Sequence, residues 1–177
     1  LMDGTNTRVW NRAVLPGVRC PHQQWAMFEF RPSSIYPFLR DAAYTSLYDF
    51  TVGYSRNWTV FTPDVRLPRD FWTKRREPPL LESQSASGAP VAAFISACST
   101  PSRRLDYLRE LMEFIDVDSF GKCEHNADVP PEFESMRNRF NQKEAMLLQY
   151  PFTIAFENSI EVDYVSEKIF NALAVGS

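Results

Sequence analysis

The second half of the chain alternates short apolar runs with stretches in which apolar residues recur at helical spacing. The apolar runs predict strands at Val91–Ile95 and Phe152–Phe156, and Val117–Phe120, which ends in Gly121, reads as another strand. The helical spacing predicts helices over residues 101–115, 133–147 and 165–173. Strand and helix therefore alternate three times, a pattern typical of a parallel sheet with right-handed crossovers and of a Rossmann-like α/β unit.

Two of these helices begin with residues that commonly cap helices. Thr100-Pro101 offers an N-cap followed by proline at the first helical position, and Asp163 is the expected cap of the third helix. A helix that follows Asp163 would place Tyr164, Glu167 and Lys168 on one face of its first turns, because they stand at i, i+3 and i+4.

The first half of the chain is less regular. Trp25–Phe30 and Phe50–Tyr54 predict strands, with a short helix from Tyr36 to Leu47 between them. Pro78–Pro90 is rich in proline, serine, glycine and alanine and reads as a linker. We therefore expect three parts: a partial domain over 1–80, a linker over 81–90 and a second partial domain over 91–177.

Composition narrows the possible partners. Nineteen basic and 22 acidic residues give a net charge of −3, so no overall basic field attracts nucleic acid or an acidic membrane surface. No apolar run approaches the roughly 20 residues that cross a bilayer. The chain opens without a signal-peptide pattern and stops at Gly176–Ser177, so we expect a segment of a longer protein, with any membrane anchor outside it.

The three cysteines are too few for a disulfide scaffold and too scattered for a zinc site, so no metal is expected. Cys98 and Cys123 each follow one of two strands joined by a single crossover. They are predicted neighbours that could form a disulfide in an oxidising compartment, leaving Cys20 unpaired. Asn57-Trp58-Thr59 is an N-glycosylation acceptor sequence. The pair Asp116 and Asp118 lies at a strand start, where we interpret it as structural.

Charged residues follow two of the predicted strands, at the sheet edge where α/β proteins bind ligands. Arg103 and Arg104 open the helix after the first strand and could hold phosphate oxygens, although such arginines are usually surface residues. After the third strand, Glu167 could accept hydrogen bonds from a sugar and Lys168 could neutralise a phosphate, which suits a nucleotide-sugar. The alternative is that Glu167 and Lys168 only begin a helix, with Tyr164 packed beside them, and bind no ligand.

Phe152–Lys168 closely resembles the signature of the α1,3-fucosyltransferase family, and the likeness continues to Gly176. Phe94–Cys98 and Val117–Cys123 are similar to the same family, nearest to its core-fucosylating plant-like branch. In the first half, only Trp25–Arg31 and Tyr54–Arg56 resemble the acceptor-side half of the family. The resemblance is strong over residues 91–177 and thin over 1–80.

The resemblance implies a GT-B architecture of two Rossmann-like domains, both incomplete in this chain, with the acceptor side first and the GDP-fucose side second. It implies metal-independent, inverting transfer of L-fucose from GDP-fucose to a GlcNAc hydroxyl of an N-glycan, in α1,3 linkage, with no cofactor. The expected location is the Golgi lumen, as part of a type II membrane protein. A catalytically silent relative that binds nucleotide or glycan, or an inactive fragment, is the alternative.

The resemblance also implies roles for donor-side residues. Arg104 and Lys168 would hold the diphosphate. Asn158, Tyr164 and Glu167 would contact fucose, ribose or phosphate, and Lys122 would lie nearby.

The catalytic base is less clear from the resemblance. The family has a glutamate followed by Ser-Pro or Pro-Pro after its first aromatic strand, where this chain has Arg31-Pro32-Ser33. Alternation along the strand puts Glu29 on the same face as Arg31, so Glu29 is the predicted base with Arg31 as its ionic neighbour. A simple surface ion pair between the two is the competing interpretation.

Overall fold

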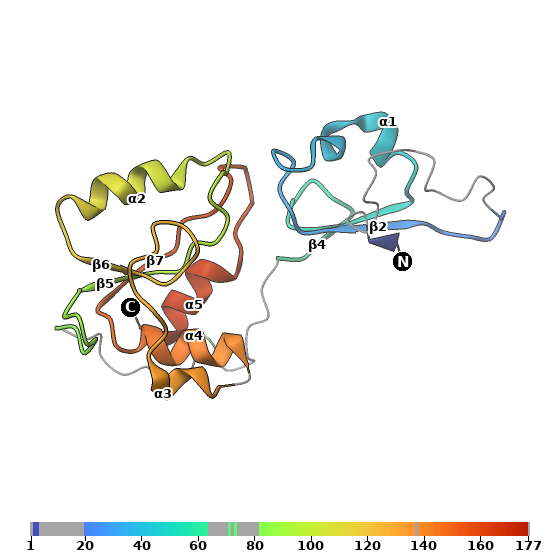
Figure 1. The fold of residues 1–177 in the computed structure, drawn as a ribbon. Coiled ribbons are helices and arrows are strands. Elements are labelled where there is room, and N and C mark those ends of the chain that lie inside the picture. Colours follow the sequence, from blue (N-terminus) through green and yellow to red (C-terminus); the bar gives the residue numbers. More distant parts are fainter. Residues whose placement is uncertain are drawn as a thin grey trace. The chain divides into compact units, whose positions relative to one another are not determined.

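The computed structural model describes residues 2–3, 20–63, 71, 73, 82–136 and 138–176 (Figure 1). The chain divides into two compact units. The first comprises Leu1–Asp64 and Ser159–Val165, and the second comprises Val65–Asn158 and Ser166–Ser177. The units therefore divide near residue 64 and not at the linker expected over 81–90.

The described end of that expected linker is held in the second unit. The Ser87 hydroxyl donates to Asp118 Oδ2 at 2.6 Å, and the Gln84 N–H donates to the Gln149 carbonyl at 2.9 Å. Asp118 also accepts a hydrogen bond of 2.7 Å from the Tyr150 hydroxyl. These bonds give Asp118 a structural role, as the sequence indicated, and they make residues 82–90 part of a folded unit. Residues 78–81 lie outside the described ranges.

The first unit is built on a parallel sheet in the order β1-β2-β3-β4. Its strands are β1 (Met2–Asp3), β2 (Ala26–Glu29), β3 (Phe50–Gly53) and β4 (Val60–Phe61). The two strands predicted in this half are confirmed. The single helix expected from Tyr36 to Leu47 is wrong, because the chain forms a 3-10 turn, η2 (Pro37–Arg40), and then α1 (Ala42–Thr45). Asp41 separates them in an extended conformation and caps α1 by accepting from the Ala43 N–H at 2.8 Å.

Aromatic side chains form most of the core of this unit. Met27, Leu39 and Tyr48 are buried, and six partly buried residues pack around them: Trp25, Tyr36, Phe38, Tyr44, Leu47 and Trp58. Gly53 allows β3 to lie close to β2, since a Cβ there would fall 2.0 Å from the Glu29 carbonyl oxygen. This close approach holds the carboxyl end of β2, and with it Glu29, in place.

The second unit contains a parallel sheet in the order β6-β5-β7. Its strands, β5 (Val91–Ala93), β6 (Val117–Ser119) and β7 (Phe152–Ile154), confirm the three predicted strands at shorter length. Figure 1 shows α2 (Arg104–Met112) on one face of the sheet and α4 (Arg139–Leu147) and α5 (Glu167–Val175) on the other. Along β5, Val91 and Ala93 pack toward α2, whereas Ala92 packs with Leu147 of α4. Both faces of the sheet are covered, so the expected α/β class with parallel strands is correct.

The predicted helix starts were wrong in three places. The helix after β5 begins at Arg104, since Thr100–Arg103 form a turn and Arg103 has a left-handed φ of 53°. The stretch 133–147 holds two helices, α3 (Pro131–Glu134) and α4. The last helix begins at Glu167 with Ser166 as N-cap. Asp163 is not its cap, because it has a φ of 65° and its carboxylate accepts from the Arg56 N–H at 3.0 Å.

The predicted disulfide between Cys98 and Cys123 is confirmed, with Cα atoms 5.4 Å apart. It joins the segment that follows β5 to the segment that follows β6. Cys20 is free and exposed, as expected. Within the described residues, no helix is both long and apolar enough to span a membrane.

Candidate functional site at the strand ends of the second unit

A cluster of opposite charges lies where β7 leads into α5. Lys168 Nζ is 3.0 Å from Glu157 Oε2 and 3.5 Å from Glu167 Oε1, and it donates to Ser166 Oγ at 2.6 Å. Glu157 Oε1 in turn accepts from the Ser166 N–H at 2.8 Å. These bonds place the ammonium group of Lys168 in the first turn of α5, where the helix dipole adds positive potential.

Lys143, on α4, belongs to the same cluster and was not predicted. Its Nζ lies 5.4 Å from the centre of the Phe94 ring. Burial lowers the pKa of Lys143 below its ordinary value, and nearby Lys168 adds to this, although Glu157 and Glu167 oppose it. No motif signals this lysine, because it stands in a polar stretch whose helical spacing marks it only as a surface position.

Glu167 is held in its charged form. Burial alone would raise its pKa, but the charge of Lys168 and a hydrogen bond from Ser166 outweigh burial and lower the pKa below its ordinary value. The carboxylate is therefore ionised above that value and available to accept hydrogen bonds from hydroxyl groups.

Arg104 is buried, and its guanidinium binds main-chain carbonyls. Nη1 donates to the Phe156 oxygen at 2.9 Å and Nη2 donates to the Ala97 oxygen at 3.4 Å. Arg104 thus ties the segment after β7 to the segment after β5. Its predicted contact with the diphosphate remains a prediction. The neighbouring Asn158 carries a buried Oδ1 that has no hydrogen-bond partner within the described part of the chain.

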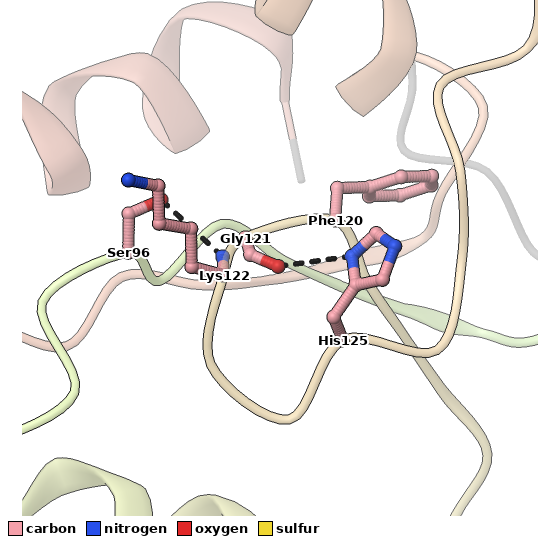
Figure 2. Close-up of a pocket in the computed structure, with 5 residues that line it drawn as sticks. All are labelled: Ser96, Phe120, Gly121, Lys122 and His125. Carbon is pink, nitrogen blue, oxygen red and sulfur yellow. Dashed lines mark hydrogen bonds between the residues drawn. The ribbon is translucent and has the colours of Figure 1, made fainter.

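A pocket of about 380 Å³ lies at the carboxyl ends of β5 and β6 (Figure 2). It is lined by Ser96, Phe120, Gly121, Lys122 and His125. Figure 2 shows Ser96 and Lys122 on one side and the rings of Phe120 and His125 on the other. The predicted residue Lys122 therefore lines a pocket with an aromatic wall, a combination that can receive a planar ring next to an anionic group.

The loops fix the shape of this pocket. His125 Nδ1 lies 3.0 Å from the Gly121 carbonyl, and the Lys122 N–H donates to Ser96 Oγ at 3.4 Å. Gly121 presses against the main chain of Ile95, since a Cβ there would fall 2.0 Å from the Ile95 oxygen. Only glycine allows this contact, which brings the loop after β6 against the segment after β5.

Glu29, the predicted base, ends β2 in the first unit and is only 2% exposed. Its Oε1 accepts from the N–H groups of Phe30 at 3.0 Å and Arg31 at 2.9 Å. Because β2 ends at Glu29, strand alternation does not extend to Arg31. The Arg31 guanidinium instead donates to the Tyr36 hydroxyl and lies 5.3 Å from the centre of that ring.

The predicted donor residues are divided between the two units. Arg104, Lys122, Asn158, Glu167 and Lys168 belong to the second unit. Tyr164 belongs to the first unit, where its buried ring packs edge-on against Tyr54 at 5.2 Å. The expectation that Tyr164 shares a helical face with Glu167 and Lys168 is wrong, because the helix begins only at Glu167.

These features define a class of protein. A lysine in the first turn of a helix and an aromatic-walled pocket, both at the carboxyl ends of parallel strands, are features found in nucleotide-binding α/β proteins. Residues 85–177 match the family described as glycosyltransferase family 10 (fucosyltransferase) C-term, so the chain belongs to this fucosyltransferase family. The resemblance stated from the signature around Phe152–Lys168 is thereby confirmed.

Similar proteins carry a more specific name. The chain is 34% identical over 174 residues to GDP-fucose protein O-fucosyltransferase 3 of Gallus gallus, covering 92% of this chain and 35% of that protein. It is 31% identical over 176 residues to the protein of the same name from Homo sapiens, covering 94% of this chain and 36% of that protein. The chain thus spans about a third of the length of the curated relatives it matches.

These names change one expectation. They describe protein O-fucosyltransferases, so they do not support α1,3 transfer to GlcNAc of an N-glycan. They also do not favour the alternative of a silent binding protein. GDP-fucose as a donor is consistent with the family match over residues 85–177.

Proposed function

We propose that the protein containing this chain transfers L-fucose from GDP-fucose to a hydroxyl group of a protein side chain, with inversion at the anomeric carbon. Two facts support the donor: the family match over residues 85–177 and the charge cluster around Lys168. The names of the relatives support a protein acceptor. The single observation that carries the proposal is that Lys168, held by Glu157 and Glu167, stands at the N-terminus of α5.

In this proposal the donor binds at the strand ends of the second unit. The diphosphate is neutralised by Lys168, by Arg104 and by the dipole of α5, so no metal or other cofactor is required. The pocket beside Lys122 takes another part of the nucleotide. Glu167 accepts hydrogen bonds from sugar hydroxyls, and the Asn158 amide accepts from them or donates to them.

Transfer forms a bond between the acceptor oxygen and the anomeric carbon and breaks the bond from that carbon to the diphosphate, so GDP leaves. The acceptor hydroxyl must lose a proton in the process. Glu29 remains the proposed base. We also propose that the two units belong to the two Rossmann-like domains of a GT-B architecture. We further propose that the reaction takes place in the Golgi lumen, an oxidising environment consistent with the bridge between Cys98 and Cys123.

The donor assignment is tested by Lys168→Ala in the full-length protein. Removing the charged partner of a phosphate should cost about 2–3 kcal/mol of GDP binding. Isothermal calorimetry measures this loss. Arg109→Ala is the control, since Arg109 is exposed, pairs with Asp106 and Glu124, and does not line the pocket. Unchanged GDP affinity in Lys168→Ala would contradict the proposed donor site.

The acceptor and the base are tested by activity. Incubation with GDP-fucose and either a folded protein acceptor or a free N-glycan, followed by mass spectrometry, shows which of the two gains a deoxyhexose; the proposal requires the protein. Glu29→Gln should lower kcat by about 100-fold or more while leaving GDP affinity unchanged, because only proton transfer is lost. Wild-type turnover in Glu29→Gln would mean that the base lies elsewhere.

A further inference from the structure

Asn57 lies in the short connection between β3 and β4 of the first unit, where it is exposed. Together with Trp58 and Thr59 it forms the triplet Asn-x-Thr, which occurs once in the 177 residues. Such a triplet accepts an N-linked glycan when the chain enters a secretory compartment and the asparagine lies in a surface loop. The residues proposed to bind the donor and to act as base lie on other segments of the chain.

The main chain around Asn57 is held on both sides. The Asn57 N–H donates to Ser55 Oγ at 3.3 Å, and the Trp58 N–H donates to the Ser55 carbonyl at 3.2 Å. On the preceding side, the Arg56 N–H donates to Asp163 Oδ2 at 3.0 Å within the same unit. The side-chain amide of Asn57, in contrast, makes no hydrogen bond with any residue that the structure describes. The connection therefore presents a free amide from a fixed backbone.

The other two residues of the triplet are tied to the fold. Trp58 packs against the core cluster of the first unit, and its ring lies 5.4 Å from that of Tyr54. The Thr59 hydroxyl accepts from the Thr51 N–H at 3.2 Å, and the Thr59 N–H donates to Thr51 Oγ1 at 3.1 Å. A glycosyltransferase cannot take Asn57 and Thr59 into its site together without breaking these contacts. We therefore expect the sugar to be added before β3 and β4 pair.

The disulfide between Cys98 and Cys123 supports the compartment that this modification needs. Disulfides form and persist in oxidising environments such as the ER lumen, which is also where N-linked glycans are attached. The bridge belongs to the second unit and reports on thiol chemistry, so its evidence for a secretory compartment is independent of the triplet.

We propose that Asn57 carries an N-linked glycan, which is added before the first unit folds. In this step Asn57 Nδ2 forms a bond to the anomeric carbon of an oligosaccharide carried on a lipid diphosphate. The bond between that carbon and the diphosphate breaks, the lipid diphosphate leaves, and the amide loses one proton. The proposal goes beyond fucose transfer, because the chain is here the substrate of another glycosyltransferase. It shares with the proposed function only the luminal location.

Mass spectrometry of the full-length protein made in cultured animal cells tests whether Asn57 is occupied. Peptide-N-glycosidase F releases the glycan and converts the linked asparagine to aspartate, and digestion in heavy-oxygen water marks only the sites that carried a glycan. Position 57 should become labelled aspartate in most chains. Unlabelled asparagine at position 57 would overturn the proposal. The wild-type protein gives this answer, so the result does not depend on the folding of a variant.

Substitutions separate the triplet from its surroundings. Asn57→Gln and Thr59→Ala should each lose the glycan completely, whereas Thr59→Ser keeps the hydroxyl and should keep the glycan. Thr51→Ala is the matched control for Thr59→Ala, because both remove the 3.3 Å contact between the two hydroxyls but only Thr51→Ala leaves the triplet intact. Loss of the glycan in Thr51→Ala, or its persistence in Thr59→Ala, would contradict the assignment.

The order of modification and folding is tested with full-length protein secreted to the bacterial periplasm, which carries no glycan at Asn57. Purified oligosaccharyltransferase and a lipid-linked oligosaccharide should modify this chain when it is freshly diluted from urea and reductant. The folded chain should be modified about tenfold more slowly or less, because the connection between β3 and β4 must first open. Equal rates for the two forms would overturn the proposed order.

Failure of this inference can be told from failure of the proposed function. If Asn57 carries no glycan while the full-length protein transfers fucose, only the glycan assignment is wrong. If Asn57 carries a glycan but the protein neither binds GDP nor transfers fucose, the proposed function fails and the glycan assignment stands.

Discussion

Removal of the disulfide between Cys98 and Cys123 should strongly destabilise the second unit. The bridge closes a loop of 25 residues in sequence separation. The loss of chain entropy in the unfolded state from a loop of this size corresponds to about 3.5 kcal/mol at 25 °C. Cys123 is also buried at 3% exposure in the cluster of Val91, Ile95 and Leu105, so replacing it by alanine removes some packing in addition.

The double variant Cys98→Ala/Cys123→Ala leaves no new thiol, and urea unfolding followed by circular dichroism measures the change in the free energy of unfolding. Cys20→Ala is the control and should unfold as wild type does, since Cys20 is exposed and free. Reduction of the wild type with dithiothreitol should cause a similar loss without any change in packing. A loss below about 1 kcal/mol in both experiments would refute the chain-entropy argument.

The same bridge should matter for the ligand pocket, because Ser96 lies two residues before Cys98, and Gly121 and Lys122 lie just before Cys123. Part of the loop geometry will survive reduction, since the Cys123 N–H donates to the Ile95 carbonyl at 3.0 Å. We therefore expect GDP affinity to fall less than stability does. If affinity were lost while the unit stayed folded, the bridge would be chiefly a support for the pocket.

Two further substitutions test the second unit. Lys143→Met should raise the free energy of unfolding at pH 7, because burial lowers the pKa of Lys143 and the folded state carries the cost of a buried charge. Lysine in the unfolded chain keeps its proton up to its pKa of 10.5, whereas folded Lys143 loses its proton at a lower pH. The stabilisation by Lys143→Met should therefore shrink as the pH rises toward 10.5. A stabilisation that does not change with pH would contradict the reasoning. Gly121→Ala should destabilise the protein by about 1–3 kcal/mol and weaken GDP binding, because the new Cβ overlaps the Ile95 carbonyl. If Gly121→Ala unfolds in urea as the wild type does, the loop after β6 can move away from Ile95.

Elements with a strong local pattern were predictable from the sequence. The strands at Val91–Ala93 and Phe152–Ile154 lie in mostly apolar runs, and the central strand Val91–Ala93 is buried throughout because both faces of the sheet are covered. Val117–Ser119 contains two polar residues and was recognised from Val117, Phe120 and the Gly121 that follows. Once the strands and their single crossover were known, the proximity of Cys98 and Cys123 followed, since neighbouring parallel strands end at the same edge. The disulfide was therefore a prediction from topology and not from the cysteines themselves.

Helix starts were not predictable, because tertiary hydrogen bonds compete with local capping there. Thr100-Pro101 looks like a helix start, but Ser102 Oγ donates to the Glu157 carbonyl at 2.8 Å, which holds the segment in a turn until Arg104. Its partner lies 55 residues further along the chain. No local pattern contains that information, and the same holds for Lys143, whose charged neighbours come from another helix and from the end of β7.

The family signature shows this limit most clearly. Asn158, Tyr164 and Lys168 are close in sequence and match the signature together, which suggests one continuous binding surface. In the structure Asn158 and Lys168 belong to the second unit, and Tyr164 belongs to the first. Several contacts hold this loop in the first unit, among them those of Glu161 with Ser33 and Tyr54 and that of Asp163 with Arg56, and nothing in the pattern of the loop marks them. A signature can therefore identify the family, but distant contacts determine which unit holds each of its residues. Contacts of this kind join the signature to residues more than 100 positions earlier in the chain, so the signature alone does not reveal them.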